Sequence, residues 1–169
     1  MLWLLRHPPI AVKWHTRCYG TTDAPLARAA YTLPELPPVD QVVHSGLMRT
    51  RIPAQRLAVQ LGVPVLEDAG WRERDFGAWE GQSWHAIYRA TGDAMDGMLS
   101  DPEGFRPGDT GETTMELAWR VVGAARALTR PTLVVTHGGP IAALLGLRDG
   151  LPVFDWPRLV PPYGTMVAL

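Results

Sequence analysis

The sequence predicts an α/β protein with a mostly parallel central sheet that helices cover on both faces. Short, nearly continuous apolar runs occur at residues 1–6, 39–45 and 131–136, as expected for strands buried on both faces. Segments with helical spacing of apolar residues separate these runs. The composition, with 46% hydrophobic and 20% charged residues, is that of an ordinary globular domain. Since no repeat or linker divides the 169 residues, we expect a single domain over 1–169.

The first half of the chain is expected to supply two strands and one helix. After the strand at 1–6, residues 8–38 are rich in Pro, Gly, Thr and Asp and predict a long irregular segment, which in compact domains is usually functional. A second strand is expected at 39–45. A helix is expected over 49–62 and should end at Gly62. Its apolar positions are Ile52, Leu57, Val59 and Leu61.

The second half is expected to add three strands and three helices. The strands are an edge strand at 63–71, a buried strand at 131–136 and a last strand at 164–169. Two of the helices are expected at 83–92 and 108–128. The third follows a glycine turn after the buried strand, is opened by Pro140 and runs to about residue 147. In the helix at 108–128, Thr and Asp candidates for the N-cap precede apolar positions at Met115, Leu117, Trp119, Val121 and Val122. Residues 80–107 are the main segment left to form a small lid.

Composition excludes several classes of protein. There are 16 Lys and Arg against 17 Asp and Glu, so a nucleic-acid partner is not expected, and any bound anion should be small and held locally. A single cysteine, Cys18, excludes an internal disulfide and fits a reducing compartment. No apolar run approaches the roughly 18 residues of a membrane span, so we expect a cytoplasmic protein without a membrane partner. The oligomeric state stays open, and a homodimer is one state that the sequence permits.

Two histidines follow two of the expected strands. His7 comes after the first strand and His137 after the strand that ends at residue 136, and ligands of open α/β sheets bind outside such carboxyl ends. Arg6 precedes His7, Arg49 opens the next helix, and Gly138 lets a ligand approach a helix N-terminus. Taken singly, each of these features has an ordinary structural explanation. Arg6 and His7 would be an exposed pair at a strand end, the glycines after His137 a turn, and Arg49 a solvated helix residue. Together they predict a site for a phosphate-like anion.

Four motifs carry a resemblance to a known family. In chain order, "LLRHPP", "HSGLMRT", "RERDFGAWEG" and "VVTHGG" resemble the motifs of the histidine phosphatase superfamily, also called phosphoglycerate mutase-like proteins. The resemblance runs from residue 2 to about residue 147. It implies a three-layer α/β/α sandwich and a phosphohistidine mechanism. By this likeness His7 is the nucleophile, Glu73 the proton donor, and Arg6, Arg49 and His137 bind the phosphoryl group.

Chemistry of this kind needs no metal or cofactor. Arg6, Arg49 and a protonated His137 would neutralise the phosphoryl oxygens, so that an uncharged His7 nitrogen can attack. A general acid contributes only about 10²–10⁴-fold, so positioning and charge must supply most of the catalysis. Which ring nitrogen of His7 attacks cannot be read from the sequence.

Two glutamates compete for the role of proton donor. Aromatic neighbours, Trp71, Phe76 and Trp79, predict an apolar setting for Glu73, which suits an acid. In an extended segment the flanking Arg72 and Arg74 should face the opposite side. Glu112 with Thr113, in "RPGDTGETT", resembles another superfamily signature that opens a helix near the site. Glu112 is therefore the reserve candidate, unless it only places favourable charge at a helix N-terminus.

The substrate is suggested by the first loop. "RHPPIAV" followed by "CYGTTDAPLA" resembles the α-ribazole phosphatase branch, which removes phosphate from α-ribazole 5′-phosphate in cobalamin biosynthesis. The stretch "KWHTR" at 13–17 departs from that branch's pattern. Tyr19 would stack on a substrate ring or brace the loop. The remaining histidines are expected to pack or face solvent: His15, His44 and His85.

Other functions compete with this interpretation. A phosphatase of the same chemistry could act on a protein phosphohistidine or on general small esters. A phosphoglycerate mutase is disfavoured, because long insertions that would retain the product are not evident. A non-catalytic phosphate-binding module would not need a nucleophile and an acid together. A metal hydrolase is disfavoured because arginines beside the histidines would repel a cation.

Overall fold

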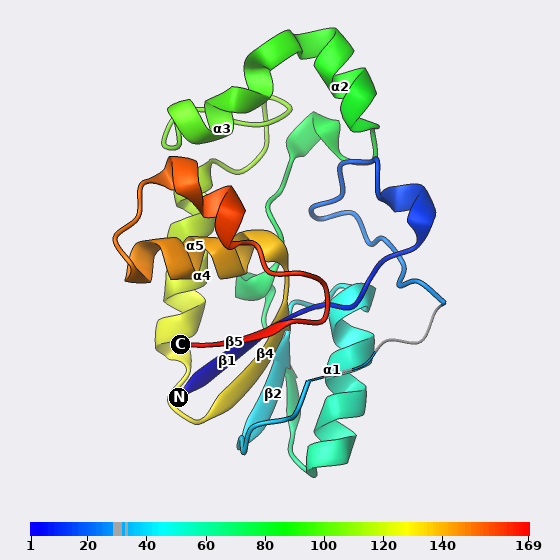
Figure 1. Ribbon diagram of the computed structural model, residues 1–169, viewed down its shortest axis with the longest axis vertical. Coiled ribbons are helices and arrows are strands. Elements are labelled where there is room, and N and C mark those ends of the chain that lie inside the picture. Colours follow the sequence, from blue (N-terminus) through cyan, green and yellow to red (C-terminus); the bar gives the residue numbers. More distant parts are fainter. Residues whose placement is uncertain (29–31, 33) are drawn as a thin grey trace.

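One mixed sheet forms the centre of the molecule (Figure 1). In the computed structural model, which describes residues 1–28, 32 and 34–169, five strands lie in the order β3-β2-β4-β1-β5. Four of them are mutually parallel, and β5 runs antiparallel to β1. The strands are β1 (Leu2–Arg6), β2 (Gln41–His44), β3 (Val65–Glu67), β4 (Thr132–Thr136) and β5 (Met166–Ala168). The predicted α/β class with a mostly parallel sheet is confirmed.

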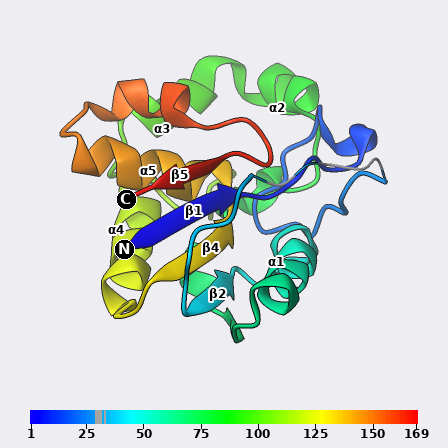
Figure 2. The same ribbon diagram turned by 60° about the horizontal axis from the view of Figure 1, so that its bottom comes forward.

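Helices lie on both faces of this sheet and above its carboxyl edge. Figures 1 and 2 show α1 (Met48–Leu61) on one face and α4 (Thr114–Ala127) with α5 (Gly138–Arg148) on the other. Two short helices, α2 (Trp84–Thr91) and α3 (Gly97–Ser100), lie beyond the ends of the strands, in the segment predicted as a lid. The 3₁₀ segments are η1 (Val12–Trp14), η2 (Ala69–Trp71), η3 (Gly77–Trp79), η4 (Gly92–Asp96) and η5 (Val153–Leu159).

The apolar strands are explained by a core on each face. Leu4 of β1 and Val134 of β4 pack with α4 and α5, whereas their neighbours Leu5 and Val135 pack with α1. Successive residues of a strand point to opposite faces, so both sets must be apolar when helices cover both sides. The two cores hold the sheet between its helix layers, and the carboxyl ends of β1, β2 and β4 meet at one edge.

The observed helix ends coincide with the capping residues, and they differ by several residues from some of the ranges expected from the sequence. Gly62 ends α1 with a left-handed φ of 69°, as predicted. Thr113 caps α4 in a capping box with Glu116, so this helix begins at Thr114 rather than at 108. The expected glycine turn after β4 is already the first turn of α5, with His137 at its N-cap. Among the described residues, no helix is long and apolar enough to cross a membrane.

Two apolar positions of the expected helices are exposed. Val59 is 84% exposed and Trp119 is 60% exposed, although both fit an apolar helical spacing. Each helix contacts the sheet along one stripe only, and these two residues lie next to that stripe rather than in it. The predicted edge strand at 63–71 is reduced to β3, and its second half forms η2.

Candidate active site

His7 lies directly beyond the end of β1 and is held in one tautomer. Its Nδ1 is 2.7 Å from the carbonyl oxygen of Pro8. A carbonyl can only accept a hydrogen bond, so Nδ1 carries the proton and Nε2 keeps its lone pair. Burial, followed by the positive charge of Arg49, lowers the pKa of His7 to about 3. His7 is therefore uncharged at neutral pH, and Nε2 is the ring nitrogen that keeps a free lone pair.

Arg6, the last residue of β1, is oriented by the C-terminal segment. Its Nη1 donates to the carbonyl oxygen of Pro161 at 2.6 Å, and its guanidinium carbon lies 3.9 Å from the ring centroid of Tyr163. Its Nε is buried and has no hydrogen-bond partner among the described residues. Buried donors are rarely left unpaired, so this N–H marks a place where an anion fits. Gly138 adjoins it, since a Cβ there would lie 3.5 Å from Arg6 Nε.

Arg49 is fully buried behind His7 and is held on three sides. Its Nη2 donates to the carbonyl oxygen of Gly20 at 2.6 Å and its Nη1 to that of Thr22 at 2.7 Å. Its Nε donates to Nδ1 of His137 at 3.2 Å. A guanidinium has five N–H groups, so two remain for a ligand.

His137 is neutral in this arrangement, contrary to the expectation of a protonated ring. Its Nδ1 accepts from Arg49, so it must carry a lone pair, and Nε2 donates to Ser45 Oγ at 2.8 Å. Burial, then the charge of Arg49, holds the pKa of His137 well below its usual range. The ring lies 5.2 Å from that of His7, measured between centroids. His137 therefore orients Arg49 and contributes no charge.

Glu73 faces His7 across a cavity of about 310 Å³. Its Oε2 accepts from the backbone N–H of Gly139 at 3.1 Å and its Oε1 from that of Arg74 at 3.0 Å. Arg74 lines the same cavity, contrary to the expectation that it faces away, because residues 72–76 form no strand. The carboxyl is thus anchored at the N-terminus of α5, in the cavity that His7 also lines.

Several residues of the cavity could not be assigned from the sequence. Its lining consists of Arg6, His7, His15, Tyr19, Glu73, Arg74, Phe76, Trp84 and Gly139. His15, expected to pack or face solvent, contributes to this lining. Tyr19 does so as well, and its hydroxyl is hydrogen-bonded to that of Tyr163 at 2.6 Å, so it braces the loop while remaining available to a ligand. His44 is buried at the end of β2 and His85 is exposed on α2, and neither lines the cavity.

The apolar setting expected for Glu73 is only partly present. Phe76 lines the cavity beside it. Trp71 instead belongs to the core beneath α4 and α5, and Trp79 packs with Cys18 and Ile87. Phe76 also packs against the cluster of Trp79, so only Trp71 of the three aromatic residues lies in a different cluster.

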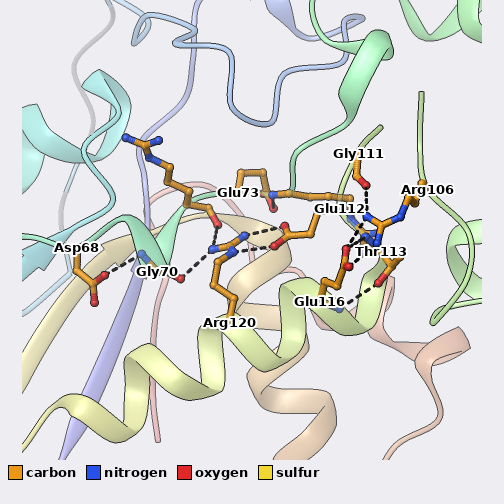
Figure 3. Close-up of polar contacts among 11 residues, drawn as sticks. Asp68, Gly70, Glu73, Arg106, Gly111, Glu112, Thr113, Glu116 and Arg120 are labelled. Atoms are coloured by element: carbon orange, nitrogen blue, oxygen red, sulfur yellow. Dashed lines mark hydrogen bonds and ion pairs between the residues drawn. The ribbon is translucent and has the colours of Figure 1, made fainter. Parts of the chain in front are cut away.

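Glu112, the reserve candidate for the proton donor, does not line this cavity, so Glu73 is the better placed of the two glutamates. Figure 3 shows its carboxylate paired with Arg120, whose Nε and Nη2 donate to the two oxygens at 2.7 and 2.8 Å. It lines a second cavity of about 380 Å³, whose lining also includes Glu73. Thr113 accepts from the backbone N–H of Glu116 and caps α4. The motif thus forms the start of α4.

Comparison with known proteins identifies the family. The sequence profile of the histidine phosphatase superfamily (branch 1) matches residues 2–169. The chain belongs to the histidine phosphatase superfamily. The predicted enzyme class, a histidine phosphatase, is confirmed.

Relatives within the histidine phosphatases differ in their substrates. Glucosyl-3-phosphoglycerate phosphatase of Mycolicibacterium vanbaalenii is 30% identical over 92% of this chain and 77% of its own. Probable phosphoglycerate mutase GpmB of Klebsiella pneumoniae is 29% identical over 94% of this chain and 79% of its own. The structure of the mycobacterial glucosyl-3-phosphoglycerate phosphatase Rv2419c in complex with VO3 superposes with a TM-score of 0.77, at 25% identity, covering 98% of this chain and 88% of that one.

The stretches described by the structure contain no group of three or more His, Cys, Asp or Glu side chains that could hold a metal ion. The cations that act on His7 are arginines, Arg49 and Arg6. The arrangement can therefore place an anion against an uncharged imidazole, with a carboxyl group on the far side of the cavity.

Gly139→Ala should lower turnover by about 100-fold while changing stability little. A Cβ at this position would collide with Glu73 Oε1. The carboxyl is the end of a flexible side chain and can move aside, but a displacement of about 1 Å in a catalytic group can cost about 100-fold in rate. Steady-state kinetics beside urea unfolding checks this. Unchanged turnover would show that the position of this carboxyl is not important.

Stability should fall as the pH drops from 7 to 5. Below pH 6.5 the histidines of the unfolded chain bind protons, whereas folded His7 stays neutral down to about pH 3 and His137 also resists protonation. The unfolded state then holds more protons, so the free energy of unfolding decreases by up to about 1.4 kcal/mol per pH unit for each such histidine. Urea unfolding across this range tests it, and His7→Gln should reduce the slope. A flat profile would contradict the burial of neutral histidines.

Proposed function

We propose that the protein is a metal-independent phosphomonoesterase that transfers the phosphoryl group of a small ester to His7 and then to water. The observation that supports this most directly is the neutral His7, with Nε2 free, between arginines and opposite Glu73. A phosphate monoester carries two negative charges, so an uncharged nucleophile beside cations avoids repulsion. The roles of the individual residues below belong to this proposal.

In the first step the phosphoryl group enters the cavity between Arg6 and Arg49. Nε2 of His7 attacks phosphorus, and the bond from phosphorus to the ester oxygen breaks. The departing oxygen takes the proton of Glu73, which becomes a carboxylate. Nδ1 of His7 keeps its proton and its bond to Pro8, so the ring is held in line throughout.

In the second step water hydrolyses the phosphorylated His7. The Glu73 carboxylate takes a proton from the attacking water, the new phosphorus–oxygen bond forms, and the phosphorus–nitrogen bond breaks. This returns His7 to its neutral form and Glu73 to its acid form, so the cycle balances. The negative charge of a bound phosphoryl group favours a proton on His137 Nδ1, which would then donate to a phosphoryl oxygen in place of accepting from Arg49.

Two substrates are each favoured by one feature of the cavity. Tyr19, Phe76 and Trp84 give it aromatic walls, which suit a leaving group with a flat apolar face, as in α-ribazole 5′-phosphate. Arg74 adds a guanidinium, which suits a leaving group with a carboxylate, as in the phosphoglycerates named for the relatives. We favour α-ribazole 5′-phosphate, because three walls are aromatic and Arg74 already donates to Thr114 Oγ1.

The test is phosphate release in the presence of EDTA. We expect p-nitrophenyl phosphate to be hydrolysed at the same rate with and without chelator, and loss of activity on chelation would refute a metal-independent enzyme. A panel with α-ribazole 5′-phosphate, glucosyl-3-phosphoglycerate, 3-phosphoglycerate and a phosphohistidine peptide then ranks kcat/KM. Binding of inorganic phosphate without turnover of any ester would instead establish a non-catalytic module, and conversion of 3-phosphoglycerate to its isomer a mutase.

A further inference from the structure

We propose that Glu80, which does not line the cavity, is a positioning residue that fixes the guanidinium of Arg49 through the backbone of residues 20–22. This inference rests on the proposed function, in which Arg49 neutralises the phosphoryl group. The carboxylate and the guanidinium do not touch. They hold opposite sides of the same short stretch of backbone.

The carboxylate of Glu80 collects hydrogen bonds from this stretch. The backbone N–H groups of Gly20, Thr21 and Thr22 donate to it at 3.1, 2.9 and 3.0 Å. The hydroxyl of Thr22 donates as well. Burial opposes ionisation of Glu80, but the bonds from Thr22, Thr21 and Phe76 outweigh it and lower the pKa of the carboxyl. Glu80 therefore stays charged at neutral pH.

One peptide unit connects the two charges directly. In the peptide between Gly20 and Thr21, the carbonyl oxygen accepts from Arg49 Nη2 at 2.6 Å and the N–H donates to Glu80 Oε1 at 2.9 Å. The peptide dipole thus points its negative end at the cation and its positive end at the anion. Hydrogen bonds in such a chain polarise and strengthen one another, most of all where the dielectric is low.

Arg49 depends on this series of hydrogen bonds because its side chain is fully buried. Within the described residues, no carboxylate lies within ion-pair distance of its guanidinium. A buried charge needs a partner or a full set of hydrogen bonds. Two of its three acceptors are the carbonyl oxygens of Gly20 and Thr22, in the loop that Glu80 holds.

The backbone of residues 20–22 is packed closely at Gly20, so it has no space in which to shift. A Cβ at Gly20 would collide with the carbonyl oxygen of Arg74 and lie 2.6 Å from Glu80 Oε1 and 2.7 Å from the Phe76 ring. Phe76, which lines the cavity, donates its backbone N–H to the same Glu80 oxygen at 3.1 Å. One carboxylate thus ties the loop behind Arg49 to a wall of the cavity. We expect its loss to misplace Arg49 without removing any group that touches the substrate.

Glu80→Gln tests this, since it keeps the shape but removes the charge and turns one acceptor into a donor facing N–H groups. We expect the inhibition constant of inorganic phosphate to rise by about 10- to 100-fold, with a matching fall in kcat/KM for p-nitrophenyl phosphate. Glu116→Gln is the matched control, because Glu116 also accepts from a backbone N–H and from an arginine and does not line the cavity. It should lose stability and keep both constants within about twofold.

A second readout does not depend on catalysis. The buried Arg49 Nε–H should give a proton resonance protected from exchange in wild type and Glu116→Gln, absent in Arg49→Lys, and less protected in Glu80→Gln. If Glu80→Gln lowers only the melting temperature, with the phosphate constant and this resonance unchanged, the inference is overturned. If wild type turns over no ester, the proposed function fails while the resonance still decides the inference. Should Glu80→Gln not fold, Thr22→Val, which removes one donor to Glu80, is expected to shift both readouts in the same direction by less.

Discussion

Replacing His7 with alanine is expected to lower kcat for every phosphate ester by at least about 10⁴-fold. Without Nε2 no phosphoenzyme can form, so water must attack the dianion directly. Arg6, Arg49 and Glu73 would still hold the ester and account for the residual rate. Binding of inorganic phosphate should persist within a few-fold, because the arginines that bind its charge are retained.

The phosphoenzyme itself gives the decisive measurement. Quenching wild type during turnover of a radiolabelled ester should leave label on the protein that is lost in acid and retained in base, as expected of phosphohistidine. His7→Ala should carry none, and His85→Gln, changed at an exposed histidine on α2, should carry as much as wild type. Normal turnover by His7→Ala, or label that survives acid, would refute the assignment of the nucleophile.

The residues at strand ends could be predicted because their placement follows from short-range patterns. Leu4 and Leu5 are both apolar because helices cover both faces of β1, and a parallel sheet must bring the ends of β1 and β4 together. His7 and His137 then become neighbours without knowledge of any long-range contact. The last strand was expected at 164–169, but its antiparallel pairing with β1 could not be predicted, because a strand of three residues carries little pattern.

The rest of the site depends on contacts between distant segments. Tyr163 covers the guanidinium of Arg6 and bonds to Tyr19, and nothing in its local sequence indicates this. The same holds for Glu80, whose partners lie almost sixty residues earlier. The neutrality of His137 also follows only from the direction of the Arg49 hydrogen bond. Sequence patterns identify which residues reach the edge of the sheet, but not how protons and charges are shared there.

Glu73→Gln should reduce turnover by an amount that depends on the leaving group. An alkoxide is a strong base and needs a proton as it departs, so esters of aliphatic alcohols should lose about 10²–10⁴-fold in kcat/KM. p-Nitrophenolate is stable as an anion at neutral pH, so its ester should lose far less in the first step. Glutamine keeps the acceptor for Gly139 N–H, so the variant should fold as wild type does.

The dependence on leaving group separates proton donation from mere positioning. If Glu73 only anchored α5, its replacement would slow all esters alike, and the plot of log kcat/KM against leaving-group pKa would shift without changing slope. We expect the slope to become steeper, because basic leaving groups alone lose the acid. Glu112→Gln, which breaks the ion pair with Arg120 outside the cavity, should leave the slope unchanged. A steeper slope for Glu112→Gln together with an unaltered one for Glu73→Gln would exchange the two assignments.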